Sequence, residues 1–395
     1  MLEEIKKLSR QILPGVIEYR RHLHANPELS FQEYNTSAYV KQVLDEIGIK
    51  WRSVAGTGVE ALIKGKLPSS QVIALRADMD ALPITEANNV VYASTNPGVM
   101  HACGHDFHTS SLLGAAKILH SLSDKFGGTV KLLFQPGEEV LPGGASIMIK
   151  EGVLKDPDVT SVIGQHAMPR IEVGKIGIRS GKHMASMDSI FVRILGKGGH
   201  GGQPHQNIDP VVIAAHIIIA LQQIVSRFAH PGEPTVLSFG KVVANGAVNV
   251  IPDEVYMEGT FRAMNEIWRD DAHGKMTKMA ENIAEGMGAK CDFKIVRGYP
   301  FLVNAEPLTT QVRRWSEEYL GKENVLDEDI WMAAEDFSYY SQIADSCFYL
   351  CGVGNKSKGI TSSLHTPTFD IDENVLETST GLMAYLAIRR LNNNE

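Results

Sequence analysis

Along its first half, this chain alternates short, mainly apolar segments with longer segments of helical pattern. Val72–Arg76, Val130–Phe134 and Ser161–Gly164 each have the length and apolar content of a buried strand, and Ser110–Leu122 carries apolar residues at helical spacing. Strands that are apolar on both faces and separated by helices are typical of a largely parallel sheet covered by helices. The sequence therefore predicts an α/β domain in which helices flank a mostly parallel central sheet.

Helices are also expected ahead of the first strand. Apolar residues recur at helical spacing over Leu2–Ile12. Pro14 is expected to interrupt that helix, because proline lacks the N–H group that a helix interior needs. A second helix should then continue to Ala25, and a third covers Tyr39–Ile47 and ends at Gly48.

A different order of elements begins near residue 188. Strand and helix patterns follow one another as βαββαβ, over residues 190–195, 209–227, 235–243, 254–262, 269–287 and 291–296. This is the order of a ferredoxin-like fold. A chain of 395 residues exceeds what one hydrophobic core usually supports. We therefore expect a second domain of residues 187–298 that is inserted into a first domain of residues 1–186 and 299–395.

Charge and composition argue against several functional classes. The formal net charge is −8, and no block of Lys and Arg is interleaved with aromatic residues, which disfavours binding to nucleic acid or to anionic lipid. The longest apolar run, Val211–Leu221, contains His216 and as a helix would cross only about half of a bilayer core, so no membrane span is expected. The N-terminal residues follow a helical pattern rather than that of a signal peptide, and we expect a cytoplasmic protein.

Cysteine usage does not indicate a disulfide framework. The four cysteines are Cys103, Cys291, Cys347 and Cys351. Four cysteines are too few to staple a chain of this length. The spacing of Cys347 and Cys351 is a poor match to a compact zinc knuckle, so we interpret both as ordinary buried residues.

Residue types that bind metals gather just after the predicted strands or between elements. The clusters are Asp78 with Asp80, His101–His108, Glu138 with Glu139, His166, and His365. In open α/β sheets, ligands bind outside the carboxyl ends of the strands. Each cluster alone has an ordinary structural explanation, such as an Asp that caps a helix or a hydrogen-bonded His. Five such clusters together favour a metal site.

Within the second cluster, Cys103 and His105 lie two residues apart. A thiolate and an imidazole in this arrangement suit Zn or a similar transition metal. Cys103 also allows another interpretation, as a nucleophile that a nearby His activates. That interpretation leaves the excess of Asp, Glu and His residues unexplained, whereas a metal site uses them all, so we favour the metal site.

Eight short motifs follow one another along nearly the whole chain. They are residues 20–28 (RRHLHANPE), 76–83 (RADMDALP), 101–108 (HACGHDFH), 134–139 (FQPGEE), 198–205 (GGHGGQPH), 249–252 (NVIP), 335–337 (EDF) and 365–367 (HTP). As a set, they resemble the motifs of the aminoacylase and carboxypeptidase family of two-metal metallopeptidases. The nearest branch is the amidohydrolase one, which holds aminoacylases, hippurate hydrolases and auxin-conjugate hydrolases. The resemblance implies a catalytic α/β domain and a ferredoxin-like lid that also serves in dimerisation.

Carried over position by position, the resemblance implies that five side chains hold two divalent metal ions. These ligands are Cys103, His105, Glu139, His166 and His365. It implies that Glu138 is the general base, which takes a proton from water and returns it to the leaving amine, and that Asp80 orients a ligand. On the lid, His200 would donate to the tetrahedral oxyanion, in an arrangement that can span a dimer. Arg262 and Asn249 would meet the carboxylate and the carbonyl of the substrate.

The chemistry of these residue types agrees with those roles. Two cations polarise an amide carbonyl and lower the pKa of bound water. Side chains alternate along an extended segment, so either Glu138 or Glu139 can bind metal while the other remains available as a base. Arg262 offers a forked donor for a carboxylate, although a salt bridge on a sheet face is equally compatible. His200 lies in a glycine-rich loop, which fits either an approach to substrate or a surface turn. Asp78 is expected to bind no metal.

These observations lead to a metal-dependent amidohydrolase that cleaves the amide bond of small N-acyl amino acids. The acyl group and the metal stay open, with Zn, Mn, Co and Ni all compatible with the ligand types. A dipeptidase or carboxypeptidase of the same family is the first alternative, and a binding protein that keeps the metals without catalysis is the second. We expect a homodimer or a higher homo-oligomer formed through residues 188–297, and no nucleic-acid or membrane partner.

Overall fold

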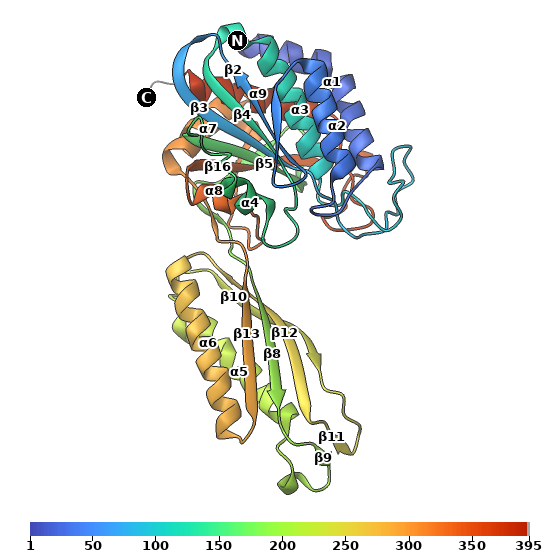
Figure 1. Cartoon of the computed structure of the whole chain (residues 1–395), viewed down its shortest axis with the longest axis vertical. Coiled ribbons are helices and arrows are strands. Elements are labelled where there is room, and N and C mark those ends of the chain that lie inside the picture. Colours follow the sequence, from blue (N-terminus) through green and yellow to red (C-terminus); the bar gives the residue numbers. More distant parts are fainter. Residues whose placement is uncertain (393–395) are drawn as a thin grey trace. The chain divides into compact units, whose positions relative to one another are not determined.

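The computed structural model describes residues 1–392, which form two compact units (Figure 1). The first unit contains Met1–His183, Val303–Asp329 and the residues from Asp336 on, and the second contains Met184–Leu302 and Ile330–Glu335. The sequence pattern assigned residues 330–335 to the first domain. They group with the second unit, where the N–H group of Ala185 donates to the carbonyls of Trp331 and Ala333.

An eight-stranded sheet forms the centre of the first unit. Its strand order is β1-β2-β4-β3-β5-β16-β6-β15. The strands are β1 (Trp51–Val54), β2 (Gly58–Lys64), β3 (Leu67–Asp78), β4 (Gly127–Gln135), β5 (Ser161–Glu172), β6 (Ile176–Ile178), β15 (Val325–Asp327) and β16 (Asp345–Gly354). The pairs β3–β4, β3–β5, β5–β16 and β6–β15 are parallel, and the other three are antiparallel. The predicted mostly parallel sheet is therefore confirmed.

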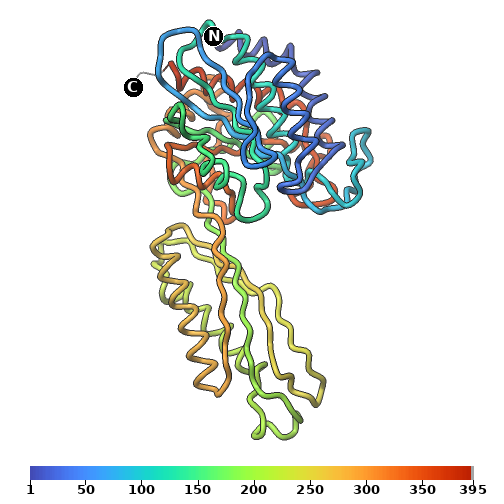
Figure 2. The backbone as a smooth tube through the Cα atoms, in the orientation of Figure 1, coloured from blue at the N-terminus to red at the C-terminus, as the bar shows by residue number. Residues whose placement is uncertain are grey.

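Helices cover both faces of this sheet. They are α1 (Leu2–Ala25), α2 (Tyr34–Ile47), α3 (His105–Ser121), α4 (Gly144–Lys150), α7 (Glu306–Leu320), α8 (Ser338–Ser341) and α9 (Val375–Leu391). All residues of β4 are buried. Leu132 and Phe134 share a core with α1, α2, α3, α7 and α9, whereas Gln135 on the opposite face accepts a hydrogen bond from Tyr340 of α8. The helix α1 lies beside both α3 and α9, so segments from the two ends of the chain meet in one layer (Figure 2).

The expected break at Pro14 is wrong, because α1 runs through it. Proline removes one backbone hydrogen bond of the helix, to the carbonyl of Arg10. Pro14 lies on the exposed side of α1, where water can satisfy that carbonyl. The opposite side of the helix, which includes Ile5 and Val16, is buried against the core and holds the helix together.

The second unit is built on a four-stranded antiparallel sheet in the order β10-β12-β8-β13. Its elements are β8 (Asp188–Leu195), α5 (Pro210–Gln223), β10 (Thr235–Val243), β12 (Glu254–Ala263), α6 (Glu266–Gly286) and β13 (Lys290–Arg297). This is the predicted βαββαβ order. Two short paired strands, β9 (Gly199–His200) and β11 (Val250–Ile251), form a separate ribbon. The strands β7 (Gly181–Met184) and β14 (Leu302–Asn304) pair where the chain passes between the two units.

The helix α5 lies close to the predicted range of residues 209–227. It continues as a π-helical turn over Ile224–Phe228, so the helical stretch covers 19 residues. By length and composition alone, it is long and apolar enough to cross a membrane. This result differs from the expectation, which took the apolar run Val211–Leu221 alone and judged it too short for a membrane span. Ile213, Ile217 and Leu221 are buried in the core of the second unit, as in a helix that packs on a sheet.

A buried ion pair joins the beginning of β8 to α6. The Asp188 carboxylate accepts hydrogen bonds from the Arg269 guanidinium at 2.6 and 2.9 Å and lies 2.7 Å from Nε2 of His273. Arg269 also donates to the carbonyl of Gly298, directly after β13. Arg269 therefore joins the beginning of β8, where the chain enters the sheet, to the residue after β13, where the chain leaves it.

Replacement of Asp188 by Asn should destabilise the second unit. Removal of one partner of a buried ion pair costs about 3–5 kcal/mol, and we expect about 3 kcal/mol here because Glu266 still accepts from Arg269. Urea denaturation followed by Trp268 fluorescence would measure the change. Asp270→Asn is the control, since its carboxylate is 61% exposed and its loss should change the free energy of unfolding by less than about 0.5 kcal/mol. Equal effects of both substitutions would contradict the assigned role.

Candidate metal centre

The carboxyl ends of three neighbouring strands bring the acidic and imidazole groups of the first unit together. β3 ends at Asp78, which pairs with Gln135 at the end of β4. β5 pairs with the other side of β3 and carries His166. Parallel strands place their carboxyl ends at one edge of the sheet, where ligands bind. The two glutamates, Glu138 and Glu139, follow β4 in the next loop at the same edge.

A tight turn places Cys103 and His105 over this edge. Gly104 has a φ of 90° and precedes the first residue of α3, His105. A Cβ atom at Gly104 would lie 2.8 Å from the Cβ of Ala167, so glycine is required both by the backbone conformation and by the close approach to β5. Through this approach, Sγ of Cys103 comes to 3.4 Å from Nε2 of His166.

Two histidines from distant segments converge on the Cys103 sulfur. Nδ1 of His166 lies 2.7 Å from the carbonyl oxygen of Ala167, which can only accept, so Nδ1 carries the proton and Nε2 presents a lone pair toward Cys103. Nε2 of His365 lies 3.2 Å from the same sulfur and 3.3 Å from Oε1 of Glu139. The side chain of His365 is 52% exposed, whereas that of Glu139 is 14% exposed.

Asp80 orients His105 and the segment that carries Glu139. Oδ1 of Asp80 lies 3.2 Å from Nδ1 of His105. Oδ2 accepts from the backbone N–H of Glu139 at 3.0 Å and from the hydroxyl of Ser30 at 2.6 Å. Nε2 of His105 is buried and makes no hydrogen bond. A buried imidazole nitrogen that is aimed at a carboxylate and a thiol without a hydrogen-bond partner is suited to a metal ion.

Asp78 and His108 both have hydrogen-bond partners within the protein. Nδ1 of His108 lies 2.5 Å from Oδ1 of Asp78, and its Nε2 accepts from the N–H of Ala167 at 2.8 Å. Oδ2 of Asp78 accepts from the Arg76 guanidinium at 2.6 Å. Both nitrogens of His108 are therefore occupied, and we interpret the pair as support for β5 rather than as ligands.

A buried network that the sequence pattern did not reveal supports Glu138. Oε1 of Glu138 accepts from the N–H of Asp336 at 3.4 Å. The Asp336 carboxylate accepts from Arg76 at 2.8 Å and from the amide group of Gln135 at 2.7 and 2.8 Å. These residues lie inside motifs that carried the resemblance, but their pairing joins segments about two hundred residues apart. Nothing local in the sequence signals such a contact.

The carboxylates give the site a strongly negative potential. Burial lowers the pKa of His105, but Asp78 and Asp80 outweigh burial and raise it to about 10. Burial, together with Glu139, raises the pKa of the Cys103 thiol well above its ordinary value. A nucleophilic cysteine needs the opposite shift, so the electrostatics of the protein groups disfavour the nucleophile interpretation. The same negative potential favours cations, which compete with protons for the thiolate and imidazole.

The remaining predicted residues belong to the second unit. His200 lies on β9 and pairs with Val250 of β11, directly after Asn249. Both His200 and Asn249 are exposed. Arg262 lies near the end of β12, is partly buried, and donates to Oγ1 of Thr260 at 3.2 Å. Burial lowers the pKa of its guanidinium.

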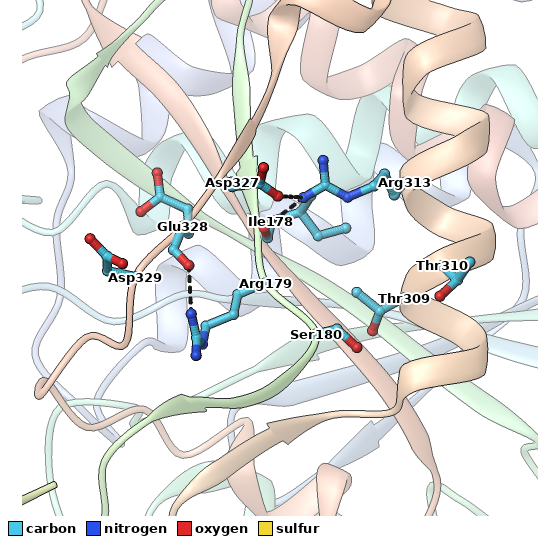
Figure 3. Close-up of a pocket in the computed structure, with 9 residues that line it drawn as sticks. All are labelled: Ile178, Arg179, Ser180, Thr309, Thr310, Arg313, Asp327, Glu328 and Asp329. Atoms are coloured by element: carbon cyan, nitrogen blue, oxygen red, sulfur yellow. Dashed lines mark hydrogen bonds and ion pairs between the residues drawn. The ribbon is translucent and has the colours of Figure 1, made fainter. Parts of the chain in front are cut away.

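A separate cavity of about 450 Å³ lies at β6, β15 and α7 in the first unit (Figure 3). Two arginines point into this region: Arg179 donates to the backbone carbonyl of Glu328, and Arg313 donates to that of Ile178. None of the candidate metal ligands lines this cavity. It therefore does not belong to the metal centre.

The donor atoms fit a pair of metal ions. Two groups share Cys103: Cys103 with His105 and His166, and Cys103 with Glu139 and His365. In each group, the ligand atoms all lie within 4.8 Å of one another. Thiolate, imidazole and carboxylate donors suit Zn and other first-row transition metals. Glu138 forms a further group with His105 and Glu139, which places a carboxylate beside the centre. These donor groups are compatible with a dinuclear metal centre.

Comparison with known proteins identifies the family. Residues 74–389 match peptidase family M20/M25/M40. The chain is 48% identical to the N-acyl-L-amino acid amidohydrolase of Geobacillus stearothermophilus over 76% of this chain and 81% of that protein. It is 40% identical to the N-acetyl-L-cysteine deacetylase of Bacillus subtilis over 96% and 89%. The crystal structure of the Bacillus subtilis YXEP protein, a dinuclear metal binding peptidase from the M20 family, superposes with a TM-score of 0.81 at 35% identity, covering 97% of this chain and 99% of that one.

The chain therefore belongs to the M20 peptidase family, in its amidohydrolase branch. The predicted family and fold are confirmed, and so is the expectation of a hydrolase rather than of a binding protein. The YXEP protein is a dinuclear metal binding member of this family, and the two donor groups that share Cys103 in this chain are consistent with such a centre.

Replacement of Cys103 by Ser should weaken metal binding as well as activity. Mutation of a residue that only supports a metal ligand lowers metal affinity by roughly 10- to 100-fold. Loss of Cys103, a donor that both groups share, should lower metal affinity by at least as much. Elemental analysis and metal titration would measure the effect, with the partly exposed Cys291→Ser in the second unit as the control. Full metal content together with loss of a covalent acyl-enzyme would instead establish Cys103 as a nucleophile.

Proposed function

We propose that this chain hydrolyses the amide bond of small N-acyl amino acids with two divalent metal ions and a glutamate base. The observation that carries the proposal is the pair of donor groups that share Cys103, with the buried carboxylate of Glu138 beside them. The names of the two bacterial relatives support an acyl amino acid as the substrate class. The acyl group and the identity of the ions are left to experiment.

The five candidate ligands would bind the metal ions, and Glu138 would transfer the proton. Cys103, His105 and His166 would hold one ion, and Cys103, Glu139 and His365 the other. When bound, the ions polarise the carbonyl of the substrate and acidify water. Glu138 takes a proton from the attacking water, whose oxygen bonds to the carbonyl carbon. Glu138 then delivers that proton to the amide nitrogen as the carbon–nitrogen bond breaks, which releases a carboxylic acid and an amine; the acid then gives its proton to the amine, leaving a carboxylate and an ammonium group.

The proposed lid residues lie far apart within one copy of the chain. His200 and Asn249 lie on the ribbon that precedes Glu254, at the beginning of β12, whereas Arg262 lies at its far end. Eight residues of extended strand separate Glu254 from Arg262, which amounts to roughly 26 Å at about 3.3 Å per residue. An N-acyl amino acid is much shorter than this. We therefore propose that His200 and Asn249 of one copy act together with Arg262 of another, His200 on the oxyanion and Arg262 on the substrate carboxylate.

A homodimer through the second unit would supply that second copy. β10 is an edge strand of the sheet, and an open edge can pair with the edge of another chain. α5 exposes Val211, Val212 and Ile219, and its other side is buried in the same unit. A row of exposed apolar residues on one helix, next to an open sheet edge, is typical of a surface that another subunit covers.

Replacement of Ile219 by Asp should disrupt the dimer, because a buried carboxylate without a partner is strongly unfavourable at an apolar interface. Light scattering over a range of concentrations would show a shift toward monomer, and turnover should fall with it if His200 acts across the interface. Ile343→Asp is the control, since this isoleucine of the first unit is 60% exposed compared with 69% for Ile219. A strictly monomeric, active wild-type protein would exclude the arrangement.

Replacement of Glu138 by Gln tests the chemistry. The variant should keep both metal ions and lose about 10²- to 10⁴-fold in turnover, the usual contribution of a general base. The assay is release of free amino acid from N-acetyl amino acids, hippurate and dipeptides, by protein that is chelated and then reloaded with Zn, Mn, Co or Ni. Near-normal turnover of Glu138→Gln would remove its role as base.

The same panel separates the proposed substrate class from its alternative. Metal-dependent release of amino acid from the acyl compounds supports the proposal and indicates which acyl group is preferred. Cleavage of dipeptides alone would make the chain a dipeptidase of the same family. A fully metallated protein that cleaves none of these compounds would contradict the proposed substrate class.

A further inference from the structure

Among the five candidate ligands, His365 has the most exposed side chain. Cys103, His105 and His166 are buried, whereas the side chain of His365 is 52% exposed. Its backbone has a φ of 59°, a left-handed conformation that costs a residue other than glycine about 1–3 kcal/mol and persists only where the surroundings enforce it. The protein must therefore contain contacts that hold this segment in place.

The segment that carries His365 is fastened at several points. The N–H of His365 donates to the carbonyl of Ala102 at 2.8 Å. The carbonyl of Pro367 accepts from the N–H of Ala87, also at 2.8 Å. At the end of the segment, Oδ2 of Asp370 accepts a hydrogen bond from the hydroxyl of Tyr92 at 2.8 Å.

The other oxygen of Asp370 meets a buried arginine. Nη2 of Arg20, in α1, donates to Oδ1 of Asp370 at 2.7 Å, and Nε of the same guanidinium donates to Oδ2 of Asp106 at 2.8 Å. Asp106 directly follows His105 in the first turn of α3. The side chains of Arg20 and Asp106 are wholly buried, and that of Asp370 is 17% exposed. One rigid, planar cation thus joins two segments that each carry a candidate ligand.

We propose that Arg20 is a positioning residue of the metal centre, which through Asp106 and Asp370 holds the His365 segment in place against the first turn of α3. This inference rests on the proposed metal-binding role of His365. Among the described residues, the guanidinium donates to Asp106, Asp370 and Glu373 and lies 3.3 Å from Nδ1 of His24. None of these partners is a candidate ligand, so Arg20 would act through the backbone of both segments. A metal site depends on such supporting contacts, because misplaced ligands lose affinity.

Replacement of Asp370 by Ala tests the inference with little risk to the fold. Arg20 keeps Asp106 as a buried partner in this variant, so no buried charge is left alone. Titration of the metal-free protein with Zn²⁺ against a competing chelator should show one of two ions bound about 10- to 100-fold more weakly and the other unchanged. Arg20→Lys, which keeps the charge but lacks the fork, should weaken the same ion.

A matched control comes from the neighbouring arginine. Arg21 forms an ion pair with Glu373 at 2.6 Å and lies over the ring of Tyr92, but its side chain is 43% exposed and none of its hydrogen bonds reaches Asp106 or Asp370. Arg21→Met should leave the affinity for both ions unchanged. A loss equal to that of Asp370→Ala would show a general effect of this surface and overturn the inference.

A double-mutant cycle with His365→Ala decides whether Asp370 acts through that ligand. If it does, adding Asp370→Ala to His365→Ala should weaken metal binding no further. Additive losses, equal weakening of both ions, or wild-type affinity in Asp370→Ala would each overturn the positioning role. If His365→Ala itself binds both ions normally, the ligand set of the proposed function fails instead, so the two failures are distinguishable.

Discussion

The candidate metal centre depends on one buried carboxylate, that of Asp80, which joins three segments of the chain. Asp80 follows β3, and its two oxygens reach Nδ1 of His105 on α3 and the N–H of Glu139 in the loop after β4. Both oxygens of Asp80 therefore hold groups whose positions matter for metal binding: the imidazole of His105 and the backbone of Glu139. Because Oδ1 takes the Nδ1 side of the His105 ring, Nε2 of His105 is directed toward the donors around Cys103. A single substitution at Asp80 would remove the support of one candidate ligand, His105, and of the backbone of another, Glu139.

Much of this arrangement could be predicted from the sequence, because local patterns report it. Apolar strands such as Val130–Phe134 were recognisable from composition, and β4 indeed has every residue buried. Clusters of His, Cys, Asp and Glu after those strands indicated a metal site, since the ends of parallel strands share one edge. The βαββαβ order of the second unit followed from alternation and helical spacing alone. These features need no knowledge of which distant segments touch.

The features that escaped prediction all depend on contacts between distant segments. Pro14 was expected to break a helix, but burial of the opposite side against the core outweighs one lost hydrogen bond. Asp336 contacts Gln135 and Arg76 across 201 and 260 residues of chain, and Asp370 contacts Arg20 across 350. A carboxylate in a loop looks the same in a sequence whether it faces solvent or a buried guanidinium. Only the fold separates the two cases.

The way in which the second unit is inserted explains how segments that are distant in sequence can still meet in the first unit. Four of the candidate ligands precede the inserted residues, and His365 follows them. The chain leaves and re-enters the first unit through β7 and β14, which pair with each other in a two-stranded sheet. The ends of the insertion are therefore adjacent, as an inserted domain requires if the host fold is to stay intact. His365 can then return to Cys103 because the distance that its segment must span is set by this pairing rather than by the length of the insertion.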